Sequence, residues 1–179
     1  MNRTFSAIAI DLTDRTSPFG SVHIRDKASV AQRLAAGGLA VAYGADTYWQ
    51  GPTASAATLH ANGDVSVTFS NCGAHGLNLA NTSGWELCVL GGDQNCSQAN
   101  SPVARGGVGD WINAVPDLES STSILVTTNS SDTNVQIDND STVLVRYAWD
   151  GLAFEYMQAG VYAHDEGFPA GPFVLLASN

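Results

Sequence analysis

The residues best suited to chemistry lie together in one polar segment near the start of the chain. Residues 11–27 read DLTDRTSPFGSVHIRDK and include Asp11, Asp14 and His23. Imidazole titrates in the range where a general base is useful, and a carboxylate can hold it in one tautomer. The segment should form a loop between a strand and a helix, which is where α/β hydrolytic enzymes place such a base. We therefore take His23 as the catalytic candidate, with Asp14, Asp11 or a group outside this chain to orient it.

Two elements must position this segment. The stretch from Thr4 to Asp11, TFSAIAID, is apolar and β-branched, which predicts a buried strand. Asp26 is a suitable N-cap for a helix over residues 27–43, and Gly44 suits its C-terminal cap. A glycine pair within the helix would allow close packing against a sheet. The face expected to pack carries Val30, Leu34, Gly37 or Gly38, and Val41.

The rest of the chain shows short alternating runs separated by Gly, Asn, Ser and Asp. Such runs predict an all-β fold, which we interpret as a jelly-roll-like β-sandwich. The stretch from Gly91 to Asp117 has no clear period and is expected to be a long surface excursion. The change of pattern predicts two units, residues 1–46 of α/β type and residues 47–179. The predicted strands are Val65–Ser70, Trp85–Leu90, Ile124–Thr128, Asn134–Ile137 and Val143–Trp149.

Composition limits the classes of partner. The 179 residues suffice for one domain or two small ones, and a hydrophobic content of 44% supports a real core. The net charge of −10 argues against nucleic acid, because binding phosphates requires Lys and Arg. No apolar run approaches the roughly 20 residues that span a bilayer. We therefore expect neither nucleic acid nor a membrane as partner.

No pattern in the sequence indicates a metal or a cofactor. His60 and His75 have no Cys or His partner at zinc spacing, and residues 138–140 lack the glycine and distal glutamate of a calcium loop. Phosphate-binding and dinucleotide-binding glycine motifs are also absent. We expect the chemistry to need neither a metal nor a cofactor.

Two features point to a lysosomal or secreted glycoprotein. Five Asn-X-Ser/Thr triplets occur in a short chain rich in Ser and Asn. Cys88 and Cys96 would close a short disulfide loop, whereas Cys72 is either a buried apolar residue or pairs elsewhere. The acidic composition also suits an acidic compartment. The candidate glycosylation sites are Asn2, Asn81, Asn95, Asn129 and Asn139.

The polar segment resembles the last active-site block of the sialate O-acetylesterases, which are serine esterases with the small Gly-Asp-Ser-type (SGNH) hydrolase fold. The resemblance is strong over residues 5–52 and 143–174 and thin between them. In SGNH folds the orienting carboxylate commonly lies three residues before the histidine, where this chain has Gly20. Further matches are Arg33-Leu34, Ala42-Tyr43-Gly44, Val145-Arg-Tyr-Ala-Trp149, Glu155-Tyr156, Tyr162-Ala-His164 and Pro169-Ala-Gly-Pro-Phe173.

The resemblance implies hydrolysis of O-acetyl esters of sialic acids or sialoglycans through an acyl-serine, with His23 as general base and then acid. No serine lies in a Gly-X-Ser-X-Gly, Gly-Asp-Ser or Gly-Gln-Ser setting. We therefore expect this chain to be the C-terminal part of such an enzyme, inactive alone, whose SGNH domain ends in a strand–loop–helix piece. The serine and most of the oxyanion hole would lie in the missing N-terminal part of the same protein.

Arg25, at the start of the predicted helix, permits two interpretations. With Asp26 and Lys27 it is typical of helix capping plus a surface ion pair, which contributes little energy. The functional alternative is that its guanidinium binds an anionic substrate, such as the carboxylate of a sialic acid.

A second interpretation belongs to another class, a non-catalytic β-sandwich that binds a carbohydrate or another partner. Its tryptophans would suit stacking against sugars, although we expect Trp149, like Tyr147, to pack in the core. A strand–loop–helix piece has no role in a sandwich, and the His23 segment has no evident structural purpose there. The tryptophans are Trp49, Trp85, Trp111 and Trp149.

Overall fold

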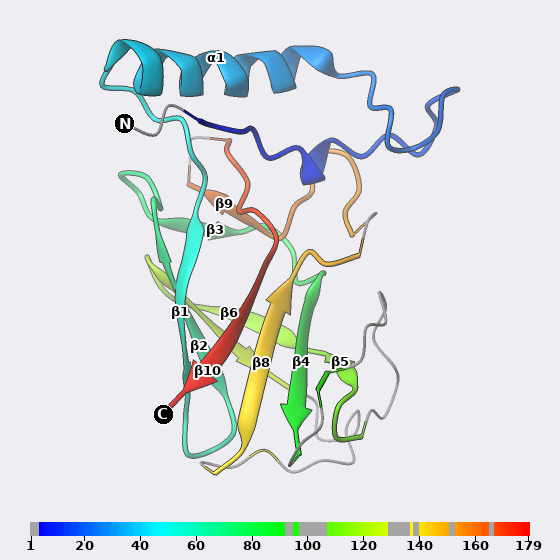
Figure 1. Ribbon diagram of the computed structural model, residues 1–179, viewed down its shortest axis with the longest axis vertical. Coiled ribbons are helices and arrows are strands. Elements are labelled where there is room, and N and C mark those ends of the chain that lie inside the picture. The colour runs from blue at the N-terminus through cyan, green and yellow to red at the C-terminus, as the bar shows by residue number, and fades with distance from the viewer. Residues whose placement is uncertain are drawn as a thin grey trace.

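A computed structural model describes residues 4–91, 95–96, 107–128, 137, 140–150, 153–164 and 167–179. These residues form one long helix, α1 (Lys27–Tyr43), one 3₁₀ turn, η1 (Ile10–Leu12), and two sheets (Figure 1). The strands are β1 Thr53–Leu59, β2 Val65–Ser70, β3 Leu77–Leu79, β4 Trp85–Leu90, β5 Trp111–Asn113, β6 Val115–Ser120, β7 Ser123–Thr127, β8 Thr142–Tyr147, β9 Val161–Ala163 and β10 Phe173–Ser178.

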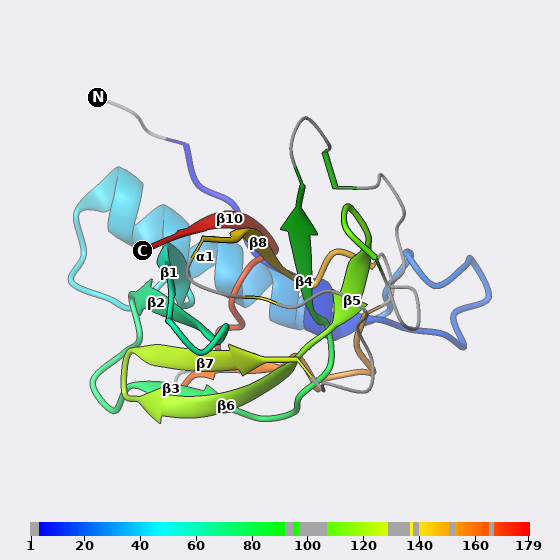
Figure 2. The same cartoon turned by 90° about the horizontal axis from the view of Figure 1, so that it is seen from below.

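The larger sheet has eight strands in the order β5-β4-β8-β10-β1-β2-β7-β6. Neighbouring strands are antiparallel except β1 and β10, which run parallel. The sheet curls until it nearly closes into a barrel, and the small antiparallel sheet β3–β9 lies with β3 beside β6 (Figure 2). The all-β expectation is confirmed, but the sandwich is not. The β1–β10 pairing joins what would have been two facing sheets into one continuous sheet.

The strand predictions succeeded where alternation is clear. Val65–Ser70 and Trp85–Leu90 coincide with β2 and β4, and the runs starting at Ile124 and Val143 correspond to β7 and β8. Most of Asn134–Ile137 lies outside the described residues. The surface excursion over residues 91–117 was wrong in part, because it contains β5 and the start of β6; residues 92–94 and 97–106 are not described. Strand β1, TASAATL, was missed because it has few large apolar residues.

Strand β8 shows how the two faces of the sheet are used. Val143, Val145 and Tyr147 alternate along it, point into the barrel core and are fully buried. The ring of Tyr147 lies 4.9 Å from that of Trp85 and 5.7 Å from that of Phe173. Its hydroxyl accepts a hydrogen bond of 3.0 Å from the backbone N–H of Val161, which satisfies a buried donor.

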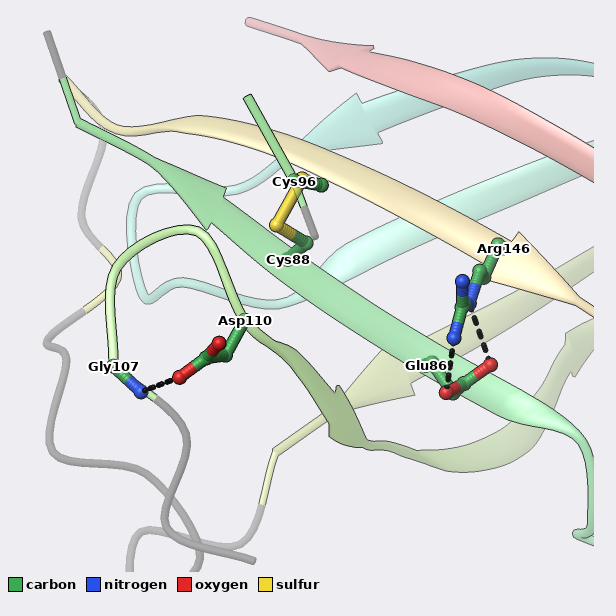
Figure 3. Close-up of a disulfide and its surroundings, with 6 residues drawn as sticks. All are labelled: Glu86, Cys88, Cys96, Gly107, Asp110 and Arg146. Atoms are coloured by element: carbon green, nitrogen blue, oxygen red, sulfur yellow. Dashed lines mark hydrogen bonds and ion pairs between the residues drawn. A yellow bond between two sulfur atoms is a disulfide. The ribbon is translucent and has the colours of Figure 1, made fainter. Parts of the chain in front are cut away.

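The opposite face of the same strand is also covered. Arg146 is 1% exposed and forms a bidentate ion pair with Glu86 of β4, with donor–acceptor distances of 2.6 and 2.8 Å (Figure 3). Nearby, a disulfide joins Cys88 of β4 to Cys96, a pairing that the sequence permits but leaves open. Cys72 is buried and outside any disulfide.

Helix α1 lies across one end of the barrel, over the N-terminal segment (Figure 1). Its predicted limits are confirmed. The Asp26 carboxylate accepts a hydrogen bond of 3.0 Å from the N–H of Ser29, and Gly44 adopts the left-handed conformation at the C-terminus with φ of 69°. The predicted packing face is confirmed at Gly37, and Val30 and Val41 are half-buried, but it was wrong at Leu34. The buried positions are Arg33 and Gly37, whereas Leu34 is 42% exposed.

The segment before the loop is not the predicted strand. Thr4 to Ala9 has no regular structure, and η1 follows it. One of its carbonyl groups, that of Ile8, accepts a hydrogen bond from the Arg33 side chain rather than from a neighbouring strand. The Phe5 ring packs over Gly37, where a β-carbon would lie 2.6 Å from it. The glycine therefore admits an aromatic ring of this segment and not a sheet.

Replacing Gly51 with alanine should destabilise the chain by about 1–3 kcal/mol. A β-carbon at this position would lie 2.2 Å from the carbonyl oxygen of Pro169, and backbone atoms cannot rotate away. Gly38→Ala is the control, because its β-carbon would meet Phe5 at an ordinary 3.5 Å and alanine favours helix. Urea unfolding followed by circular dichroism measures both. A Gly51→Ala variant as stable as the parent would contradict the close backbone approach.

Candidate active site

The loop between η1 and α1 is organised around the carboxylate of Asp14. Arg25 donates to it from Nε at 2.5 Å and from Nη2 at 2.8 Å, and the backbone N–H of Arg25 donates at 3.3 Å. The same guanidinium donates to Oγ1 of Thr16 at 2.7 Å. Planar guanidinium and carboxylate groups match in this bidentate geometry, so the pair joins the two ends of the loop.

His23 lies on this loop, before α1, as the sequence predicted. Its backbone N–H donates to the carbonyl oxygen of Gly20 at 2.9 Å, and its carbonyl oxygen accepts from the hydroxyl of Ser17 at 2.7 Å. The residue is exposed. Within the described part of the chain, no hydrogen bond or ion pair holds the imidazole, and neither Asp11 nor Asp14 contacts it. The loop therefore fixes the backbone of His23 and leaves its ring available to another group.

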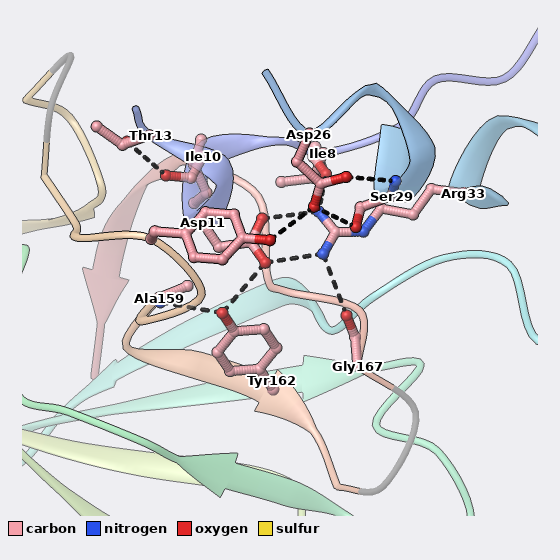
Figure 4. Close-up of polar contacts among 11 residues, drawn as sticks. Ile8, Ile10, Asp11, Thr13, Asp26, Ser29, Arg33, Ala159, Tyr162 and Gly167 are labelled. Carbon is pink, nitrogen blue, oxygen red and sulfur yellow. Dashed lines mark hydrogen bonds and ion pairs between the residues drawn. The ribbon is translucent and has the colours of Figure 1, made fainter. Parts of the chain in front are cut away.

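Asp11 belongs to a buried network at the base of the loop (Figure 4). Its two carboxylate oxygens each accept a hydrogen bond of 2.7 Å from Arg33 of α1, and the hydroxyl of Tyr162 in β9 donates to Oδ2 at 3.2 Å. Arg33 also donates to the carbonyl oxygens of Ile8 at 2.7 Å and Gly167 at 3.3 Å. One guanidinium thus ties the N-terminal segment and α1 to the loop after β9.

The two candidate orienting carboxylates differ in how costly it would be to break their present ion pairs. Asp11 is fully buried, and leaving Arg33 would strand a buried charge. Asp14 pairs with Arg25, whose side chain is 59% exposed, so its ion pair is much less costly to rearrange. The assignment of the orienting group stays a prediction, and the geometry favours Asp14.

A hollow of about 430 Å³ opens beside the loop. Tyr156 reaches it from the β-part of the chain and donates a hydrogen bond of 2.8 Å to the carboxylate of Asp26. Arg15 and Glu155 form an ion pair of 2.8 Å. This volume suits a small polar ligand, although His23 is not part of the lining. The lining residues are Thr13, Asp14, Arg15, Thr16, Arg25, Asp26, Glu155 and Tyr156.

Two of the three carboxylates that line this hollow, those of Asp14 and Asp26, are held in their charged form. Hydrogen bonding from Arg25, and then from Thr16, lowers the pKa of Asp14 from 3.8 to about 2. Hydrogen bonds from Ser29, and then from Tyr156, lower the pKa of Asp26 from 3.8 to about 2. A negative charge at the first turn of α1 also suits the helix dipole.

The residues missed from the sequence are those that bond the carboxylates of Asp11 and Asp26. Arg33, Tyr156 and Tyr162 were matched to a family but not assigned to the site. One signal was present, since an arginine on the inner side of an otherwise apolar helix needs a buried partner. The identity of that partner depends on residues 22 positions away along the chain.

A second group superficially resembles a catalytic set. Nε2 of His60 lies 2.7 Å from Oγ of Ser66, which donates to Oε1 of Glu119 at 3.0 Å. In a serine hydrolase the carboxylate must contact the imidazole, whereas here it contacts the serine. Ser66 is also buried. We read this group as a structural hydrogen-bond chain between β2 and β6.

The other candidates have mixed outcomes. Trp85 and Trp111 are buried and Trp49 is half-buried, whereas Trp149 is 46% exposed, contrary to its expected place in the core. Of the glycosylation candidates, Asn81 and Asn95 are described, and Asn2, Asn129 and Asn139 lie outside the described residues. The described part of the chain contains no cluster of three metal-ligating side chains and no helix that could cross a membrane.

Comparison with known proteins identifies first the fold and the domain that the chain matches. A crystal structure of a carbohydrate acetylesterase from Xanthomonas citri has the same fold, with a TM-score of 0.65 over 94% of this chain and 31% of that chain at 21% identity. The family model for the sialate O-acetylesterase C-terminal domain matches residues 54–177.

The particular family follows from sequence identity. Sialate O-acetylesterases from Mus musculus and Homo sapiens are 34% and 31% identical to this protein over the whole of its chain. The chain belongs to the sialate O-acetylesterase family. It spans 29% and 30% of the length of these two relatives.

Asp11→Asn should lower the free energy of unfolding by about 3–5 kcal/mol, because Arg33 would be left buried without its counter-charge. Asp14→Asn is the matched control and should cost far less, since its partner Arg25 is exposed to solvent. Chemical denaturation measures both. Equal losses from the two variants would mean that Asp11 does not hold α1 in place.

The depressed pKa values predict how stability responds to acid. A carboxyl whose folded-state pKa is lowered stabilises the fold above its ordinary pKa of 3.8 and loses this contribution as the pH falls towards about 2. The Asp26→Asn variant should therefore lose less stability than the parent between about pH 4 and about pH 2. Melting temperatures across this range provide the measurement. Parallel curves for variant and parent would argue against charged capping by Asp26.

Proposed function

We propose that this chain is the C-terminal part of an esterase that hydrolyses O-acetyl esters of sialic acids or sialoglycans through an acyl-serine. Its relatives are sialate O-acetylesterases along its whole length, and this chain-wide identity is the observation that carries the proposal. The serine and most of the oxyanion hole are contributed by residues outside these 179, upstream in the same protein. No metal or cofactor takes part.

In this mechanism His23 is the general base and then the general acid. Its ring removes the proton from the serine hydroxyl as the serine oxygen attacks the acetyl carbonyl, and returns the proton to the departing sugar oxygen. Water then attacks the acetyl-serine with His23 again as base, which releases acetate and restores the serine. The exposed position of His23 and the absence of a partner for its ring among the described residues support this role, because the ring is available to a serine from another part of the protein.

The loop chemistry supports particular roles for its charged residues. Asp14 is the preferred orienting group, and Asp11 holds the helix through Arg33. Arg25 has an exposed guanidinium at the hollow and binds the carboxylate of the sialic acid, sharing its donors between that group and Asp14.

Residues 1–46 form the end of the hydrolase domain, and residues 47–179 form the β-domain attached to it. Only two residues of helix α1, Arg33 and Gly37, are buried, and Gly37 is covered by Phe5 of the N-terminal segment. The remaining apolar residues of the helix would be covered by the rest of the hydrolase domain. The exposed apolar residues of the helix and loop are Phe19, Val22, Leu34, Leu39 and Tyr43.

The enzyme acts in a lysosomal or secreted setting as a glycoprotein. The Cys88–Cys96 disulfide supports an oxidising compartment during folding, because cytosolic thiols are kept reduced.

His23→Ala in the longer protein should lower turnover of an O-acetylated sialic acid by about 10⁴-fold or more, with the melting temperature nearly unchanged. His75→Ala is the matched control, because His75 is also exposed but lies outside the loop. Steady-state kinetics and thermal unfolding provide the two readouts.

The chain alone, with its 179 residues, should show no serine-dependent turnover of an activated acetyl ester. Near-normal turnover by His23→Ala, or hydrolysis by the chain alone that an organophosphonate blocks, would overturn the mechanism.

A further inference from the structure

A second hollow, of about 420 Å³, lies outside the loop of His23, on the outer face of β8. Leu90 of β4, Trp111 of β5 and Cys96 of the Cys88–Cys96 disulfide line it. Its surface is largely apolar and aromatic, and Trp149 and Val174 leave much of their surface exposed there. The lining residues are Leu90, Asn95, Cys96, Trp111, Leu144, Arg146, Trp149 and Val174.

The electrostatics of this hollow favour a neutral ligand. The guanidinium of Arg146 lies 4.0 Å from the ring centre of Trp111 and 5.8 Å from that of Trp149. Its charge is already matched by Glu86 through two hydrogen bonds. An anion would have to compete with a buried bidentate pair, which is costly to disturb. A sugar, which combines an apolar ring face with hydroxyl groups, fits an indole beside polar atoms.

One residue of the lining can carry such a sugar covalently. Asn95 is exposed and begins the triplet Asn95-Cys96-Ser97, and the disulfide at Cys96 anchors its backbone to β4. No hydrogen bond joins Asn95 to another described residue. Asn81, by contrast, is half-buried and already uses its amide, donating to the carbonyl of Gln158 and accepting from the N–H of Ser83 at 2.8 Å.

We propose that Asn95 carries an N-linked glycan whose first N-acetylglucosamine packs in this hollow against Trp149 and Val174. The glycan comes from a lipid-linked pyrophosphate donor. A bond forms between Nδ2 of Asn95 and C1 of the sugar, the bond from C1 to the pyrophosphate oxygen breaks, and the amide loses one proton. The sugar ring then covers apolar surface that the protein leaves exposed. The site depends on passage through the secretory pathway and not on esterase activity, because its residues lie outside the His23 loop.

The test uses the chain secreted from cultured mammalian cells behind an added leader. Peptide mass spectrometry should find Asn95 occupied. Hydroxyl-radical footprinting should find Trp149 oxidised severalfold more slowly in the parent than in Ser97→Ala, which removes the triplet but keeps Asn95. Ser83→Ala is the matched control, since it removes the Asn81 triplet, whose residues do not line the hollow, and should leave Trp149 protected.

Enzymatic trimming of the glycan on the parent protein distinguishes the effect of the first sugar on Trp149 from that of the remaining sugars. Cleavage that leaves a single N-acetylglucosamine on Asn95 should preserve protection of Trp149, and complete removal should abolish it. This comparison uses one folded protein and so does not depend on secretion of a variant. An unoccupied Asn95, or oxidation of Trp149 at the same rate with and without the sugar, would overturn the proposal. Protection of Trp149 in Ser97→Ala would likewise assign the hollow to another occupant, such as a second copy of the chain.

Discussion

The buried ion pair between Asp11 and Arg33 is the constraint on which the arrangement of the candidate site depends. Both groups are almost completely excluded from water, so each charge must be matched in place. Matching them brings η1 under α1, and the remaining donors of Arg33 reach the carbonyls of Ile8 and Gly167. The loop that carries His23 begins after Leu12, the residue that follows Asp11, and ends at the cap of α1. Both ends of that loop are therefore positioned by a single guanidinium and the helix to which it belongs.

The β-part of the chain takes part in this arrangement. Tyr162 of β9 donates to Asp11, and Tyr156 donates to the capping carboxylate of Asp26. Both tyrosines come from the segment that follows β8, which is anchored in the barrel core by the ring of Tyr147. A helix end and a loop that would be marginal by themselves are thus stabilised by a well-packed barrel. In the proposed enzyme the β-domain therefore helps to hold the loop that supplies the catalytic base, and does not act as an independent domain.

The continuity of the large sheet depends on one parallel contact. Every other pairing in the eight-stranded sheet is antiparallel, but β1 and β10 run side by side in the same direction. This pairing brings together the beginning and the end of the domain matched by the family model. A sheet of eight twisted strands curls. A single continuous sheet also has two exposed edges fewer than a pair of open sheets.

The sequence alone determined the features that depend on neighbours along the chain. The limits of α1 follow from Asp26 and Gly44, β2 and β4 follow from alternation, and the place of His23 on a loop before the helix follows from its flanks. Tertiary structure decided the rest. The segment TFSAIAID has the composition of a strand, yet residues 4–9 have no regular structure, and the carbonyl of Ile8 bonds the Arg33 side chain. The partners of Asp11 and Asp14, the burial of Arg33 in place of Leu34, and the curling of two presumed sheets into one all depend on contacts between residues far apart in sequence. Such contacts leave no periodic pattern in the chain, because each of them depends on how the whole chain packs.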